Sequence, residues 1–178
     1  MKKIFILCTF IMSQLITFAQ KMPSIAGVDF ASSYLTCKEK FDNRFNGGQI
    51  SQQESTNVLK YFDVKFADNL FNWVTFGFQR DVNGNSFLNS ADFMIFYKLD
   101  ESEKAKQKRD ELFEFYKQKY EFRWSDIGKD GWKYYVLGHD PVTYENGLVV
   151  IYIIQTPEYL FLDVAYGPID FIKPQDEI

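Results

Sequence analysis

The chain has 178 residues, of which 46% are hydrophobic and 19% aromatic, and its formal net charge is −4. This composition supports a packed core and excludes long disordered regions. An acidic chain without a cluster of basic residues on one helix also argues against a nucleic-acid partner.

The first residues have the pattern of a secretory signal peptide. Two lysines follow Met1, and an apolar stretch then reaches Phe18 and Ala19. The small residue Ala19 predicts cleavage directly after residues 1–19, which leaves residues 20–178 as a single domain. The apolar stretch is too short and too interrupted for a membrane span, and no later stretch is long enough for one. We therefore predict an exported protein, periplasmic or extracellular, without a transmembrane segment after signal removal.

Cysteine usage restricts how such a protein can be stabilised. Only Cys37 is left once residues 1–19 are removed, so no disulfide can form within the chain. Cys37 also shares an apolar stripe with Tyr34, Phe41 and Phe45 at helical spacing. This position favours a small buried side chain over a reactive nucleophile.

The first half of the domain is predicted to contain one helix and three strands. Residues 20–27 precede the helix as an extended arm, Ser32 or Ser33 supplies its N-cap, and the sequence Asn46-Gly47-Gly48 ends it. After a polar loop, alternating apolar residues predict strands over residues 57–66, 70–79 and 87–99. The dipeptide Asn83-Gly84 predicts a hairpin turn between the last two strands.

The second half repeats this order with a longer helix. We expect that helix to begin at Asp100, with Glu103 in a capping box, and to end near Tyr120. The run Lys104–Arg109 is interpreted as a solvated face of the helix, opposite a buried stripe made by Ala105, Leu112, Tyr116 and Tyr120. Strands are predicted over residues 121–127, 132–139, 148–154 and 159–166, with the last two forming a hairpin.

The order of these elements predicts an α+β fold. Adjacent strands without helices between them require antiparallel pairing. We expect one antiparallel sheet of about six to eight strands with two helices on a single face. The two helix starts lie about seventy residues apart, which suggests pseudo-repeats over residues 27–99 and 100–168.

Three segments carry a resemblance to a known group of proteins: AGVDFASSYLTCKEKF, the aromatic-rich FADNLFNWVTFGF and the closing LDVAYGP. Together with the signal peptide, they resemble uncharacterised small exported proteins of Gram-negative bacteria. The helix-plus-sheet repeats of these proteins are similar to the β-lactamase-inhibitor-protein-like architecture. In that architecture the helices cover one face of the sheet and the other face is open, so the resemblance implies a binding or assembly role.

Enzymatic residues are sparse. His139 is the only histidine, and Asp140 adjoins it. A Ser–His–Asp triad would need a serine close to both, and no Gly-x-Ser-x-Gly motif is present. We expect no catalytic residues, and the alternative is a small hydrolase that uses His139 with a carboxylate or with Cys37. One histidine and one cysteine do not make up an ordinary zinc site.

A possible calcium loop lies in the predicted hairpin between Asp81 and Asp92. Its polar residues fall at the spacing of EF-hand ligands. Ser86 stands where such a loop needs glycine, and the flanking segments are strands, so a polar hairpin turn is favoured over a calcium site. We predict no metal and no cofactor.

Alternation along the strands divides the aromatic side chains between two faces of the sheet. The face opposite the helices is predicted to carry Trp73, Thr75, Phe96, Lys98, Tyr135, Tyr152, Phe161 and Asp163. Asp163 interrupts an apolar strand, so either this face meets water or Asp163 has a partner.

Aromatic side chains mixed with a few polar groups on an uncovered sheet suit the recognition of a protein or peptide. We therefore predict a non-enzymatic protein that binds a macromolecular partner in the cell envelope. Its expected binding residues are Trp73, Phe96, Tyr135, Tyr152, Phe161 and Asp163. Two alternatives stay open. The aromatic rings could serve only to stabilise the sheet by cross-strand packing, or the protein could carry a small ligand in a pocket between helix and sheet.

Overall fold

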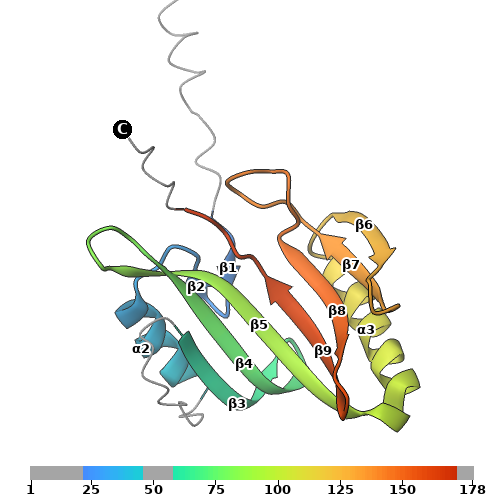
Figure 1. Ribbon diagram of the computed structural model, residues 1–178. Coiled ribbons are helices and arrows are strands. Elements are labelled where there is room, and N and C mark those ends of the chain that lie inside the picture. The colour runs from blue at the N-terminus through green and yellow to red at the C-terminus, as the bar shows by residue number, and fades with distance from the viewer. Residues whose placement is uncertain (1–21, 46–57, 172–178) are drawn as a thin grey trace, which may run out of the picture.

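The computed structural model describes residues 22–45 and 58–171. The predicted signal peptide, the predicted helix end at residues 46–48 and the predicted loop at residues 50–56 therefore lie outside the described residues. The central element is a seven-stranded antiparallel sheet with the strand order β3-β4-β5-β9-β8-β7-β6 (Figure 1). The predicted α+β class is confirmed.

The elements follow one another along the chain much as the sequence indicates. The sheet consists of β3 (Val58–Phe66), β4 (Asn69–Arg80), β5 (Ser86–Lys98), β6 (Phe122–Ile127), β7 (Lys133–Leu137), β8 (Val149–Gln155) and β9 (Tyr159–Tyr166). The helices are α2 (Tyr34–Arg44) and α3 (Ser102–Lys117), the latter preceded by the 3-10 turn η1 (Leu99–Glu101). Where we expected only an extended arm, β1 (Ser24–Ile25) and β2 (Val28–Asp29) form a small two-stranded sheet.

The sheet is built from two runs of neighbouring hairpin strands that meet in its middle. β3, β4 and β5 follow α2, and β6, β7, β8 and β9 follow α3. The two runs join where β5 pairs with β9, from Ala91 opposite Tyr166 to Lys98 opposite Tyr159. The two predicted pseudo-repeats stay a prediction.

Helix α2 begins where the sequence predicts. The hydroxyl of Ser33 accepts a hydrogen bond from the N–H of Thr36 at 3.3 Å, which caps the first turn. Cys37 and Phe41 are fully buried, and the ring of Phe41 stacks on that of Phe76 with 3.8 Å between ring centroids. The predicted apolar stripe thus fixes α2 against the first run of strands.

The start of α3 differs from the prediction. Glu101, not Glu103, accepts a hydrogen bond from the N–H of Lys98 at 3.2 Å, because η1 places the first turn earlier in the chain. Glu103 instead forms an ion pair with Lys106. Ala105, Leu112 and Tyr116 of the predicted stripe are buried.

Arg109 corrects the prediction that the whole basic run is solvated. Its side chain is buried because residue 109 lies one turn from both Ala105 and Leu112 on the same stripe. Arg109 donates hydrogen bonds to the carbonyl of Lys133, at 3.1 Å, and to the carboxylate of Asp110, at 2.8 Å. A buried charge is tolerated at this position because these acceptors satisfy it.

Both helices pack on the same face of the sheet. Phe113 of α3 stacks on Tyr135 with 4.0 Å between ring centroids, and the ring of Tyr116 lies 6.0 Å from that of Tyr166. The strand registers place Tyr135, Tyr166 and Phe76 on one face, which is the face that Phe41 of α2 also contacts. We call the opposite side the open face (Figure 1). Neither described helix is long and apolar enough to cross a membrane.

The packing of α2 generates a stability prediction. Phe41→Ala removes a fully buried ring and should lower the free energy of unfolding by about 3–5 kcal/mol. Leu35→Ala on the same helix is a matched control, since Leu35 is 76% exposed; its effect should stay within about 0.5 kcal/mol. Urea unfolding followed by circular dichroism measures both. Equal midpoints for the two variants would contradict the described contact of α2 with the sheet.

Candidate functional site on the open face of the sheet

Cross-strand pairing arranges the open face in rows across the four central strands. One row consists of Trp73, Met94, Asp163 and Tyr152, which come from β4, β5, β9 and β8. The next row consists of Thr75, Asp92, Ala165 and Val150 from the same strands. On the other side of the first row, Phe96 faces Phe161, which in turn faces Ile154. The two central strands therefore bring an acidic residue from each row together.

The aromatic side chains of this face form a contiguous cluster. The ring of Phe161 lies 5.6 Å from Trp73 and 5.8 Å from Phe96, and Phe96 lies 4.6 Å from Tyr159, all measured between centroids. The Nζ of Lys60 lies 4.6 Å from the centroid of the Trp73 ring. Trp73, Phe96 and Phe161 are each partly exposed. Such cross-strand contacts stabilise the sheet and leave ring edges available for a partner.

One residue of the predicted site lies elsewhere. Tyr135 faces the helices, where its ring stacks on Phe113 and its hydroxyl donates to the carboxylate of Asp110 at 2.8 Å. The cause is the register of β7, in which Tyr135 pairs with the buried Ile151. Tyr134 takes the place on the open face that we predicted for Tyr135.

Asp163 lies at the centre of the open face and is fully covered by its neighbours. Its exposed fraction is 0%, and its Oδ2 accepts a hydrogen bond from the hydroxyl of Tyr152 at 2.9 Å. The other carboxylate oxygen, Oδ1, has no hydrogen bond of normal geometry. The sequence predicted that either the face meets water or Asp163 has a partner. Tyr152 is that partner, but it satisfies only one of the two oxygens.

Asp92 lies diagonally next to Asp163 and is partly exposed. It forms no hydrogen bond or ion pair with any residue in the described ranges. Burial raises the pKa of the Asp92 carboxyl. We call Asp92 and Asp163 the acidic pair.

The electrostatics of Asp163 follow from this environment. Burial is the largest effect, and together with the charge of Asp92 it raises the pKa of Asp163 to about 7, although the Tyr152 hydroxyl and the nearby N–H of Phe93 act in the opposite direction. The same burial, with the two carboxylates close by, raises the pKa of Tyr152. Two carboxyl groups that pair with no described cation therefore compete for protons in the middle of the sheet.

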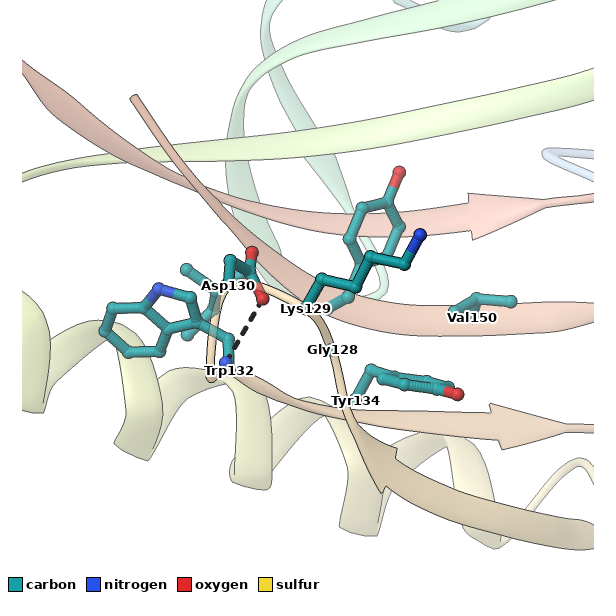
Figure 2. Close-up of a pocket in the computed structure, with 8 residues that line it drawn as sticks. Gly128, Lys129, Asp130, Trp132, Tyr134 and Val150 are labelled. Carbon is teal, nitrogen blue, oxygen red and sulfur yellow. Dashed lines mark hydrogen bonds between the residues drawn. The ribbon is translucent and has the colours of Figure 1, made fainter. Parts of the chain in front are cut away.

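A pocket of about 460 Å³ lies on the open face beside Tyr152. The turn between β6 and β7 forms one side of it with Gly128, Lys129, Asp130 and Trp132, and residues of β7 and β8 form the rest. Figure 2 shows Lys129 extending from this turn above Tyr134 and Val150, while Trp132 points away from them. Because Tyr152 belongs both to the pocket wall and to the hydrogen bond with Asp163, the pocket and the acidic pair adjoin each other.

The residues of the alternative hydrolase are far apart in the fold. Cys37 lies on the buried side of α2, and burial raises the pKa of its thiol to about 12, which disfavours the nucleophilic thiolate. His139 follows β7 near the other end of the strand order. Within the described part of the chain its ring contacts the side chains of Glu121 and Arg123, the carbonyl of Tyr144 and the ring of Tyr144. None of these contacts is with a serine, threonine or cysteine side chain.

The possible calcium loop adopts the geometry of a hairpin turn. The carboxylate of Asp81 accepts hydrogen bonds from the N–H groups of Asn83 and Asn85, at 2.9 and 2.8 Å. Asp92 lies well along β5, where it pairs with Ala165. Across residues 22–45 and 58–171, no group of three or more His, Cys, Asp or Glu side chains is placed to hold a metal ion.

Sequence reasoning missed part of this site. Asp92 alternates with Met94 and Phe96 along β5, so its face could have been assigned, but its position beside Asp163 depends on the pairing of β5 with β9. The contribution of Lys129 depends on how the turn folds over β8, for which the sequence carries no signal. The search for similar proteins adds no further residues, because no known family, curated protein or solved structure matches the chain.

The acidic pair generates a pH-dependent stability prediction. The pKa of Asp163 is higher in the folded protein than in the unfolded chain, so the folded state binds this proton more tightly. The stability that results is fully present below about pH 4 and is lost as the pH rises to about 7. Asp163→Asn removes this loss and should stabilise the protein at about pH 8 by up to roughly 4 kcal/mol. Its stability should also vary less between about pH 4 and 8.

Thermal unfolding at a series of pH values measures this effect. Asp126→Asn is the matched control, because Asp126 is exposed on the edge strand β6. That control should leave the pH profile unchanged. An Asp163→Asn variant that is less stable than the wild type at about pH 8 would contradict the described environment of Asp163.

Proposed function

We propose that this chain is an exported, non-enzymatic binding or assembly protein that recognises a protein or peptide partner in the cell envelope through the open face. The observation that carries the proposal is a sheet face that neither described helix covers, with its partly exposed aromatic cluster, Trp73, Phe96 and Phe161. Export, to the periplasm or beyond the cell, rests on the signal-peptide pattern of residues 1–19.

The shape and chemistry of the open face support this proposal. Tyrosine and tryptophan side chains contribute large contact areas at low entropic cost, and they dominate the energy of many interfaces. The pocket beside Tyr152 offers a concave place for one anchoring side chain of a partner. Burial of Asp163 with one oxygen unsatisfied is expected to cost stability in the free protein, and such a cost is typical of groups kept for binding.

The alternatives receive less support. A hydrolase would need His139 close to a nucleophile, and a carrier would need a pocket between helix and sheet. The space between α2 and the sheet is filled by stacked rings, as the 3.8 Å contact of Phe41 with Phe76 illustrates. The pocket next to Tyr152 lies on the open face instead.

Photo-crosslinking in the native cells tests the proposal. A photoreactive phenylalanine analogue at Phe96 should form a discrete crosslinked product with a protein partner. The same analogue at Leu35, which is 76% exposed on α2, is the control and should not form that product. Crosslinks of equal yield from both positions, or none from the open face, would contradict the proposal.

A variant of the aromatic cluster provides the second part of the test. Trp73→Ala should lower the yield of the Phe96 crosslink about ten-fold or more, because it removes a large aromatic contact from the interface. Leu70→Ala on the same strand is the control, since Leu70 is exposed and lies outside the aromatic cluster. Circular dichroism must show that both variants are folded. An unchanged yield with folded Trp73→Ala would remove the aromatic cluster from the proposed interface.

A further inference from the structure

The smaller side chains of the open face lie in the row that contains Ala165. The row Thr75, Asp92, Ala165 and Val150 contains small or medium side chains, whereas the adjacent row contains Trp73, Met94 and Tyr152. Thr75, Asp92, Ala165 and Val150 are each partly exposed. A group that approaches the middle of the sheet therefore reaches the carboxylate of Asp92, with Asp163 beside it beneath the surface.

Lys60 continues this row by pairing with Thr75, but no described lysine or arginine forms an ion pair with Asp92 or Asp163. Lys60 lies over the rings of Trp73 and Phe62, at 4.6 and 5.1 Å from their centroids. Lys129 extends over the pocket (Figure 2). Negative charge in the centre of the face is thus left without a counter-charge.

A second observation indicates that something else completes this site. Asp163 is fully buried, yet its Oδ1 accepts no hydrogen bond of normal geometry. Buried carboxylates are normally paired or hydrogen-bonded, and an incomplete set is costly. A positive charge placed above Asp92 would offset that cost for both carboxylates.

The surroundings favour an organic cation over a metal ion. Two carboxylates are too few for an ordinary calcium site, and no larger acidic group exists among the described residues. Ala165 and Val150 offer an apolar floor on which the methylene stem of a basic side chain can lie while its charged end meets Asp92. Trp73 lies diagonally next to Asp92 across β4 and β5, so its ring, which Lys60 already contacts, adds a further apolar surface for that stem.

We propose that the protein partner inserts an arginine or lysine side chain over Ala165, so that its cation forms a charge-assisted hydrogen bond with Asp92 and interacts through space with Asp163. This inference rests on the proposed function and names the chemistry that the open face recognises. An apolar residue next to the basic one would occupy the pocket beside Tyr152. The partner segment is therefore basic and apolar, complementary to the acidic pair and the aromatic cluster.

Selection from a library of random peptides about 12 residues long tests the inference with a defined probe. The wild-type protein should enrich peptides that contain arginine or lysine beside an aromatic or aliphatic residue. Asp92→Asn should lose the enrichment for basic residues, whereas the control Asp126→Asn should keep it. Circular dichroism establishes that each variant is folded. Enrichment of basic residues that persists with folded Asp92→Asn would overturn the inference.

A double-mutant cycle on one selected peptide measures how strongly its basic residue interacts with Asp92. Replacement of its arginine by citrulline, or of its lysine by norleucine, should weaken binding to the wild type about ten-fold or more. The same replacement should weaken binding to Asp92→Asn less than about two-fold. Equal losses on both proteins would overturn the inference.

The outcomes separate this inference from the proposed function. Selected peptides that require Trp73 but lack basic residues would overturn the acidic recognition and leave the binding role of the open face in place. If no selected peptide requires Trp73, the result contradicts the proposed function, and it also overturns the inference, which depends on that function.

Discussion

The pairing of β5 with β9 joins the two runs of strands and sets the orientation of every side chain in the centre of the sheet. In this register Phe93 and Val164 point toward the helices, while Met94 and Asp163 point to the open face. A slip of one residue would place apolar side chains on the open face and carboxylates under the helices. The burial of Phe93 between rings from three other strands opposes such a slip. The acidic pair is thus a direct consequence of the register that builds the core.

This arrangement gives the two faces of the sheet different roles. The helix side is closed by apolar contacts such as the stacked rings of Phe41 and Phe76, and these contacts stabilise the fold. The open face contains groups that packing alone does not require, above all a carboxylate with one unsatisfied oxygen in the middle of a central strand. An apolar residue at Asp163 would serve the sheet better. The proposed binding role of this face would account for the tolerance of this costly residue.

Much of this arrangement can be predicted from the sequence where the local pattern is strong. The long strands β4, β5, β8 and β9 alternate clearly, and they place Trp73, Phe96, Tyr152, Phe161 and Asp163 on one face, as the structure describes. The prediction that Tyr135 lies on the open face was wrong. β7 is short, and a long connection rather than a tight turn leads from it to β8, so the sequence does not fix its register.

The features that could not be predicted depend on contacts between distant parts of the chain. Asp92 and Asp163 are far apart in sequence and meet only through the pairing of β5 with β9. The pocket depends on how the turn with Lys129 lies against β8. Arg109 belongs to a run of charges whose composition suggests solvent, but its phase on the helix places it in the buried stripe. Local composition and spacing do not contain this information.

Among the described residues, no cation forms an ion pair with Asp92 or Asp163 on the open face. NMR titration of the carboxyl carbon resonances of both residues measures whether the two groups lack a counter-charge. We expect both groups to titrate above the ordinary aspartate value of 3.8, with Asp163 near 7. Titration of both groups at or below the ordinary value would show that cations or additional hydrogen bonds already satisfy them, and would contradict the account.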